Sequence, residues 1–422
     1  MAPLPRPSTR ILDAGEKGLP VGAAGRTVAD FLAAGPRLAD LWTPLLVVDD
    51  GALDANIAFL AEWVAARGLE LMPHGKTTMA PQLWQRQLDA GATGITVANP
   101  AQLRVAADAG IPAIMLANQL SQPEVVRWTA DLVGAGTRVW SWVDDTRAID
   151  LIERALGDAP AAPLEVLVDV GRPGGRTGAR SFADAVAVAE RAAASPAVRL
   201  AGVTGYEGSV AHGRGDDALA SARAYIGELL AVHDAIAHLY DDRDVVVSAG
   251  GSAYPDVVGK AFAAASVAGD RARFVLRSGA YVVHDHGYYR RNSPFEGAGL
   301  RAAARGLARV VSRRDAETAI VDAGKRDFPF DEGLPVPLYA ISAEGARMPL
   351  PGAEMTKLSD QHGFVRVSPD SRLRIGDLVV FGLSHPCTMF DKWCLIPVVE
   401  SLDDATFDPE TAVVTDLIET RF

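Results

Sequence analysis

The sequence predicts an α/β protein in which a (β/α)8 TIM-type barrel is joined to a mostly antiparallel β domain. Two patterns along the chain predict this fold. Between about residues 50 and 290, short apolar runs alternate with longer amphipathic stretches rich in alanine. After residue 300 the helical periodicity fades, and short strand-like runs are separated by turns of Pro, Gly and Asp. Alternating strands and helices are typical of parallel sheets, whereas successive short strands are typical of antiparallel sheets.

Eight apolar runs in the first region are predicted to be strands. They cover residues 69–73, 94–98, 113–117, 138–143, 164–169, 200–206, 244–248 and 273–277. The runs are unbroken rather than alternating, as expected where both faces of a parallel sheet are covered. Eight strand–helix units in about 240 residues match the size of a (β/α)8 barrel. A doubly wound open sheet is the alternative, and the number of strands favours the barrel.

Helices are expected between these strands. The first, over residues 51–67, follows two capping candidates, Asp49 and Asp50. Other helical runs cover residues 79–90, 99–109, 121–133, 181–194 and 216–239.

Five strands are predicted in the second region. They cover residues 307–312, 318–322, 363–367, 378–382 and 394–400. We therefore expect residues 1–48 to contribute to the β domain, residues 49–295 to form the barrel, and residues 296–422 to form the C-terminal β domain.

The composition argues against several classes of partner. The chain has 41 Lys and Arg against 53 Asp and Glu, a net charge of −12, and no basic stripe, so nucleic acid is not expected. It has neither an uninterrupted apolar run of about 18 residues nor the apolar core of a signal peptide, so no membrane association is expected. The only cysteines are Cys387 and Cys394, which excludes a disulfide scaffold and favours the cytoplasm.

Lys76 follows the first predicted strand, in the motif His74-Gly75-Lys76-Thr77. The C-terminal ends of barrel strands line the active site, and a sheltered lysine near other cations can react as an imine-forming amine. Gly-Lys-Thr also ends a P-loop, but that motif needs a glycine where Glu70 stands. On this segment alone, an ordinary lysine in a surface turn is equally consistent.

A serine–glycine turn, Ser248-Ala249-Gly250-Gly251-Ser252, follows the seventh predicted strand. Loops at this position of a barrel commonly bind phosphate. Paired glycines let backbone N–H groups approach an anion, and the start of the next helix adds partial positive charge. A glycine turn that only caps a helix is the alternative, and the position after strand seven favours the phosphate interpretation.

The glycine-rich segment 169–178 follows the fifth predicted strand and contains Arg176. A tight loop over the barrel mouth would let this guanidinium reach a phenolate or a carboxylate. A flexible surface loop is the alternative.

The segment Ser384-His385-Pro386-Cys387 is the candidate metal site. On an extended chain, residues two apart point the same way, so imidazole and thiolate would converge on one ion. This ligand pair suits Zn²⁺ best, although Mn²⁺ or Co²⁺ can bind there when that metal is the more available one. A packed cysteine beside a surface histidine is the alternative. The other candidate ligands, which we rate lower, are His284, His286 and His362.

Several segments together resemble one known family. They are PHGKTTMAPQLWQRQLDAGATGITVANPAQLRVAADAG, VDVGRPGGRTG, the Tyr206-Glu207-Gly208 turn, SAGGSAYPD, RSGAYVVHD and SHPC, within residues 40–400. The chain resembles the D-serine dehydratase/D-threonine aldolase family of pyridoxal-phosphate enzymes with the alanine-racemase fold, in particular a bacterial D-amino-acid deaminase-like subgroup. Thr78 departs from the family, since many members have histidine there.

The resemblance implies a role for each matching residue. Lys76 matches the Schiff-base lysine, and Arg176 matches the arginine near the phenolic oxygen of the cofactor. Tyr206 and Tyr281 match positions that contact the ring or the substrate. The phosphate-binding turn would comprise Ser248, Gly250, Gly251 and Ser252. His385 and Cys387 match the metal ligands of the dehydratases, whereas the aldolases carry a carboxylate in place of the cysteine.

The implied function is that of a metal-dependent lyase, an ammonia-lyase converting D-serine or D-threonine to a 2-oxo acid and ammonia. Cleavage of the same substrates to glycine and an aldehyde by an aldolase is the alternative. A non-catalytic pyridoxal-phosphate protein of vitamin homeostasis is a second alternative, against which the β domain and its metal pair argue. The resemblance also implies a homodimer that binds small D-amino acids.

Overall fold

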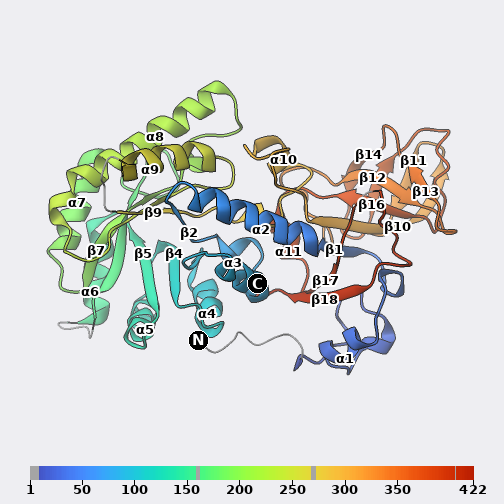
Figure 1. Cartoon of the computed structure of the whole chain (residues 1–422), viewed down its shortest axis with the longest axis horizontal. Helices are drawn as coiled ribbons and strands as arrows, with labels where there is room; N and C mark the ends of the chain where they lie inside the picture. Colours follow the sequence, from blue (N-terminus) through green and yellow to red (C-terminus); the bar gives the residue numbers. More distant parts are fainter. Residues whose placement is uncertain (1–8, 158–161, 268–271, 404) are drawn as a thin grey trace.

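The computed structural model describes residues 9–157, 162–267, 272–403 and 405–422. Figure 1 shows two bodies: a barrel surrounded by helices, and a β domain beside it. The chain enters through the β domain, builds the barrel and returns. Residues 1–8 of the predicted N-terminal segment lie outside the described residues.

The barrel contains the eight predicted strands. They are β2 (Glu70–Leu71), β3 (Ile95–Val97), β4 (Ala113–Gln119), β5 (Arg138–Val143), β6 (Leu164–Val170), β7 (Val198–Gly205), β8 (Val246–Ala249) and β9 (Arg273–Leu276). Their order is β2-β9-β8-β7-β6-β5-β4-β3, with all neighbours parallel. A single bridge between His74 and Thr96 links the two end strands. The predicted barrel is therefore confirmed, and the doubly wound alternative is wrong.

Helices cover the outside of the barrel (Figure 1). They are α2 (Asp50–Ala65), α3 (Pro81–Asp89), α4 (Pro100–Asp108), α5 (Pro123–Gly134), α6 (Thr146–Leu156), α7 (Phe182–Ala193), α8 (Asp216–Ala235) and α9 (Pro255–Val267). Asp49 caps α2, as predicted, by accepting a hydrogen bond from the Ala52 N–H at 2.7 Å. Its second oxygen accepts from the Leu402 N–H at 2.7 Å, so one carboxylate ties the first barrel helix to the β domain.

The β domain is built on a ten-stranded sheet. Its strands are β1 (Leu45–Asp49), β10 (Ala304–Asp315), β11 (Thr318–Val321), β12 (Val336–Ile341), β13 (Arg347–Pro349), β14 (Glu354–Leu358), β15 (Gly363–Arg366), β16 (Leu378–Gly382), β17 (Leu395–Val399) and β18 (Val414–Glu419). The main path is β13-β12-β16-β10-β1-β17-β18, and β11, β15 and β14 branch from β10. Every strand pair is antiparallel except that of β1 with β17. All five predicted strands are present.

Short helices complete the described chain: α1 (Val28–Ala33), α10 (Tyr288–Asn292) and α11 (Pro386–Phe390). Strand β12 was not predicted because Pro337 interrupts its apolar pattern. In the structure, a register shift at Pro337 lets β12 pair with β16 despite the missing N–H. None of the helices in the described ranges is both long enough and apolar enough to span a bilayer.

The interior of the barrel is filled by side chains. One buried cluster comprises Met72, Met115, Trp140, Trp142, Leu167, Ala201, Val246 and Val275. A filled interior is typical of eight-stranded barrels, so space for a ligand remains only where loops extend beyond the strands.

Candidate active site

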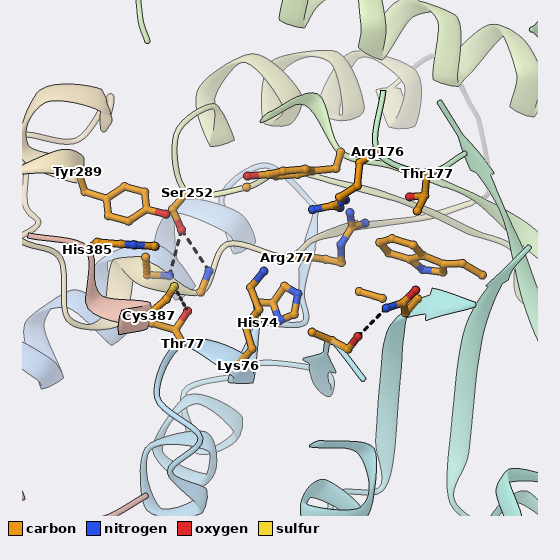
Figure 2. A pocket seen from close by; sticks show the side chains of 18 residues that line it. His74, Lys76, Thr77, Arg176, Thr177, Ser252, Arg277, Tyr289, His385 and Cys387 are labelled. Atoms are coloured by element: carbon orange, nitrogen blue, oxygen red, sulfur yellow. Dashed lines mark hydrogen bonds between the residues drawn. The ribbon is translucent and has the colours of Figure 1, made fainter. Parts of the chain in front are cut away.

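A cavity of about 430 Å³ lies at the C-terminal ends of the barrel strands. Figure 2 shows Lys76 and His74 side by side, with Arg176 and Arg277 in one direction and His385, Cys387 and Tyr289 in the other. His385 and Cys387 come from the β domain, whereas Lys76, Arg176 and Arg277 come from the barrel. The site is therefore shared between the two domains, and its volume is typical of pockets for small ligands.

Lys76 lies in a short helical turn, η4 (Gly75–Thr77), directly after β2, and lines the cavity as predicted. Burial is the main cause that lowers the pKa of its amine. The nearby Cys387 acts in the opposite direction, and Arg176 and Arg277 lower the pKa further. A lysine with a lowered pKa carries more unprotonated amine at neutral pH, which is the form that reacts as a nucleophile or a base.

Arg277 is the cation that the sequence analysis missed. It follows β9 and is only 5% exposed. Its Nη1 donates to the Ser248 hydroxyl at 2.6 Å and to Thr204 Oγ1 at 3.0 Å, and its Nη2 donates to the Gly205 carbonyl at 2.6 Å. The guanidinium lies 5.0 Å from the ring of Trp142. Ser248 therefore holds an arginine, and unlike Arg277 it does not line the cavity.

Arg176 and Tyr206 line the cavity together, as the resemblance implied. The guanidinium of Arg176 lies 5.2 Å from the Tyr206 ring centre. The glycine-rich loop that carries Arg176 is held at its C-terminal end, because the Gly178 N–H donates to Asp144 at 2.9 Å and the Ala179 N–H donates to the Asp169 carbonyl at 2.8 Å. These hydrogen bonds argue against the flexible-loop alternative at that end.

The serine–glycine turn borders the cavity, but its backbone is engaged differently from the prediction. The N–H groups of Gly250 and Gly251 donate to the Glu207 carboxylate at 3.0 and 2.6 Å. The Ser252 hydroxyl accepts hydrogen bonds from the N–H groups of Gly279 and Ala280 at 3.2 and 3.1 Å (Figure 2). In this structure the two glycine N–H groups therefore bind Glu207, and the binding of a phosphate by this turn stays a prediction.

Tyr281 does not line the cavity. Its ring is buried between the barrel and the first helices, where its hydroxyl accepts a hydrogen bond from Gln87 of α3 at 2.9 Å. The tyrosine that does line the cavity is Tyr289 of α10, and burial raises the pKa of its hydroxyl well above the ordinary value. Tyr289 therefore lies at the cavity wall where the resemblance led us to expect Tyr281, and the contact of Tyr281 with the ring or substrate stays a prediction.

His385 and Cys387 both line the cavity, but they converge for a different reason from the one predicted. The chain is not extended there. His385 has a left-handed φ of 55° and precedes the first turn of α11, which contains Cys387. The Thr77 hydroxyl lies 3.4 Å from the cysteine Sγ, which brings the metal-ligand candidates next to the lysine turn.

Asp331 holds the imidazole of His385 from the β domain. Its Oδ2 lies 2.5 Å from His385 Nδ1, and its Oδ1 accepts from the Thr388 hydroxyl at 2.6 Å. Burial would lower the pKa of His385, but Cys387 and Asp331 together raise it to about 9. Burial would raise the pKa of the Cys387 thiol, but His385, Thr77 and Lys76 together lower it. His385 and Cys387 therefore each shift the pKa of the other towards its charged form.

Unlike His385 and Cys387, the three other candidate histidines do not line the cavity. His284 Nε2 lies 2.9 Å from Glu296, and His286 is packed against Gly382 with a pKa that burial lowers to about 3. His362 is exposed in the turn between β14 and β15. Within the described ranges, no three His, Cys, Asp or Glu side chains gather into a metal cluster, so His385 and Cys387 offer two ligands.

Two families match the sequence. Residues 48–254 match "Alanine racemase, N-terminal domain" and residues 303–399 match "Putative serine dehydratase domain". Among characterised proteins, D-threonine aldolase from Arthrobacter sp is 28% identical over 338 residues, which cover 80% of this chain and 83% of that protein.

Two solved structures have the same fold. D-threonine aldolase from Filomicrobium marinum superposes with a TM-score of 0.75 at 26% identity, over 92% of this chain and 96% of that one. D-threo-3-hydroxyaspartate dehydratase from Delftia sp. HT23 superposes with a TM-score of 0.69 at 22% identity, over 91% of this chain and 99% of that one. A mutant of the latter enzyme is known in a metal-free form.

The fold and the lysine-bearing cavity define an alanine-racemase-like protein with an added antiparallel β domain. The chain carries an alanine-racemase N-terminal domain followed by a putative serine dehydratase domain, and it is similar to D-amino acid aldolases and dehydratases. These relatives are lyases, and the alanine-racemase domain implies pyridoxal phosphate as the cofactor.

The residues of the cavity fit this cofactor. Lys76, Arg176 and Arg277 are cationic, and in the part of the chain that the structure describes, none of them forms an ion pair with a carboxylate. Beside them, His74 Nδ1 is shielded from solvent without a hydrogen-bond partner. A cluster of unneutralised cations suits an anionic ligand, and an amine among them suits an aldehyde.

Proposed function

We propose that this chain is a pyridoxal-phosphate- and metal-dependent dehydratase, which converts a D-β-hydroxy amino acid such as D-serine or D-threonine to a 2-oxo acid and ammonia. The observation that carries the proposal is that Lys76 and the pair His385–Cys387 line one cavity. Dehydration needs a group that accepts the proton of the α-carbon and a site that activates the hydroxyl group of the neighbouring β-carbon.

Lys76 is the residue that would hold the cofactor and move the proton. When bound, the cofactor supplies an electron sink for the bond broken at the α-carbon. The Lys76 amine accepts the α-proton of the substrate, which requires its unprotonated form. Burial and the two arginines favour that form by lowering the pKa of the amine.

Arg176, Tyr206 and Arg277 orient the cofactor in this proposal. Arg277 is fixed by three hydrogen bonds to β7 and β8, so it offers a rigid positive charge. The guanidinium of Arg176 lies over the Tyr206 ring, so the charge and the aromatic face are presented together. Fixed donors of this kind hold a reacting group in place without reorganisation.

His385 and Cys387 would hold Zn²⁺ or another divalent ion such as Mn²⁺ or Co²⁺. Such an ion supplies a Lewis acid for the β-hydroxyl, because hydroxide is a poor leaving group. Asp331 favours the imidazole tautomer that carries its proton on Nδ1, so Nε2 is left as the ligand atom. With two protein ligands, positions stay open for the substrate.

Retro-aldol cleavage is the second candidate function, supported by the likeness to D-threonine aldolase. It needs the β-hydroxyl to lose its proton, whereas dehydration expels the hydroxyl whole. Cys387 favours dehydration, since the aldolases that the chain resembles carry a carboxylate at that position. We also propose that the enzyme is a cytoplasmic homodimer.

A product assay separates the two reactions. The holoenzyme is incubated with D-serine and D-threonine, with and without a chelator. Dehydration gives pyruvate and 2-oxobutyrate with ammonia; glycine and acetaldehyde from D-threonine would show an aldolase instead. Chelation and Cys387→Ala should both abolish product, whereas Cys394→Ala, which changes an exposed free cysteine, should not. Full activity after exhaustive chelation would remove the metal from the mechanism.

A further inference from the structure

Glu207 is a buried carboxylate beside the cavity that takes no part in the chemistry above. It lies in η5 (Glu207–Ser209), directly after Tyr206, and its side chain is fully shielded from solvent. Its Oε2 accepts the Gly250 N–H at 3.0 Å and its Oε1 accepts the Gly251 N–H at 2.6 Å. Both oxygens therefore bind one turn, which compensates for the cost of burying the charge.

The turn held by Glu207 lies against the Tyr206 ring. A Cβ on Gly251 would lie 2.7 Å from Tyr206 Cε2, and a Cβ on Gly208 would lie 2.5 Å from the ring carbon Cζ. Side chains at these positions would displace the ring, because contacts below 3.0 Å are repulsive. The two glycines thus leave the room that the ring occupies, and Glu207 holds one of them in place.

The opposite side of the turn is bound to the segment after β9. The Gly250 carbonyl accepts the Arg277 N–H at 3.2 Å and the Ser278 hydroxyl at 3.1 Å. The Ser252 hydroxyl accepts the N–H groups of Gly279 and Ala280 (Figure 2). The carboxylate of Glu207 therefore joins β7, the turn after β8 and the turn after β9 at one corner of the cavity.

We propose that Glu207 is a positioning residue for the cofactor: it holds the Tyr206 ring and the 250–252 turn as one rigid unit at the cavity wall. Because the two glycine N–H groups are occupied, Glu207 acts through Tyr206 and Ser252, which line the cavity, and does not touch the ligand itself. The proposal rests on the binding of pyridoxal phosphate in this cavity and is independent of the bond that the enzyme breaks.

The test is the variant Glu207→Gln, which keeps the shape but replaces one acceptor oxygen with an amide NH₂ that faces an N–H. Losing one charge-assisted hydrogen bond in this unit should weaken cofactor affinity about tenfold. The circular dichroism of the absorption band of the bound cofactor, measured at saturation, should fall. A less firmly held Tyr206 ring would impose a less asymmetric environment on the cofactor. Glu228→Gln, which changes an exposed glutamate paired with Arg172 on the same side of the barrel, should alter neither quantity.

Two outcomes would overturn the proposal. One is a Glu207→Gln variant with a less stable apo form but unchanged cofactor affinity and dichroism, which would make Glu207 a purely structural residue. The other concerns Gly251→Ala, which decides if Glu207→Gln does not fold. Its Cβ would lie 2.7 Å from Tyr206 Cε2 and 3.3 Å from a Glu207 oxygen, so it should disturb the contact between the ring and the turn. Unchanged dichroism in this variant would overturn the proposal. The absorption spectrum of the wild-type protein is measured before any variant is compared. If it lacks the absorption band of the cofactor, the assignment of pyridoxal phosphate itself is refuted.

Discussion

The two ends of the barrel use arginine in opposite ways. At the N-terminal ends of the strands, Arg138 binds Glu165 at 2.9 Å, Arg199 binds Asp241 at 2.8 Å, and Arg273 binds Glu70 at 2.5 Å. At the C-terminal ends, Lys76, Arg176 and Arg277 line the cavity, and none of them has a carboxylate within ion-pair distance among the residues described.

The difference separates stability from function. The ion pairs at the N-terminal end neutralise the charged side chains at the base of the barrel. No unpaired charge among these arginines is left to attract a ligand. The three cations at the other end have no carboxylate within ion-pair distance among the described residues, although burying Arg277 costs free energy. An anionic cofactor would supply the missing charge, so its binding should stabilise the folded chain. The predictions below test this contrast.

The largest effect is expected from Lys76→Ala. Without the amine, the cavity keeps its arginines but loses its proton acceptor and its covalent anchor, so kcat/KM should fall about 10³-fold or more. Steady-state assays on D-serine would measure this fall, and the absorption spectrum would report the loss of the covalently bound cofactor. Lys260→Ala, at an exposed position of α9, is the matched control. A Lys76→Ala variant that still binds the cofactor covalently would refute the assignment.

Asp169 and Asp241 should respond to pH with opposite signs. Burial raises the pKa of Asp169 to about 6, with Asp144 adding to the shift, whereas Arg199 lowers the pKa of Asp241. A raised carboxyl pKa means that the folded state binds more protons between about pH 4 and pH 6, so the free energy of unfolding falls as pH rises through that window. A shift of about two pKa units corresponds to about 3 kcal/mol.

Asp169→Asn should therefore gain stability over the wild type as pH rises from about 4 to about 6, up to about 3 kcal/mol, with little further change above about pH 7. Asp241→Asn should lose stability at pH 8, because a lowered pKa stabilises the fold above the unfolded value and is lost in acid. Urea unfolding of the cofactor-free protein at about pH 4 and at about pH 8 measures both effects, because the two carboxyl groups change the stability in the acid range with opposite signs. A pH-independent effect of Asp169→Asn would contradict the prediction.

The fold was predictable from sequence because its signals are local and repeated. Each barrel strand is an apolar run, and Lys76 and Arg176 lie directly after two of them. Arg277 was missed because an arginine at a strand end is ordinary in sequence. It becomes distinctive only when Ser248 and Thr204, from two other strands, accept its hydrogen bonds.

Side-chain direction was less predictable than position. Tyr281 and Tyr289 lie eight residues apart, and only the turn η7 (Ala280–Val282) and helix α10 decide which of them reaches the cavity. His385 and Cys387 were paired correctly from an incorrect assumption of extended chain. The left-handed φ of His385, followed by Pro386 at the start of α11, brings them together instead. Such conformations depend on tertiary contacts that a single sequence does not display.

Two arginines at opposite ends of β9 compare the two ends of the barrel directly, since Arg273 begins the strand and Arg277 follows it. Arg277→Gln should weaken cofactor affinity roughly tenfold, since a buried charge next to the ligand is lost. Arg273→Gln, four residues earlier, should cost about 1–2 kcal/mol of stability through its broken pair with Glu70 and leave cofactor affinity unchanged. Fluorescence titration with pyridoxal phosphate and urea unfolding give the two quantities. Equal effects of both variants on affinity would remove the functional distinction between the ends.

The smallest effect is expected at Asp331, a carboxylate near the cavity. It forms an ion pair with His385 and not with Lys76, Arg176 or Arg277. Asp331→Ala should weaken Zn²⁺ binding about tenfold, because the imidazole of His385 loses the acceptor that fixes its tautomer. Asp331→Asn keeps a carbonyl oxygen for the Nδ1–H and should retain most of the affinity. Metal titration by calorimetry on the purified variants measures this without relying on turnover. If Asp331→Ala binds Zn²⁺ as tightly as the wild type, the carboxylate serves the fold of the β domain and not the metal.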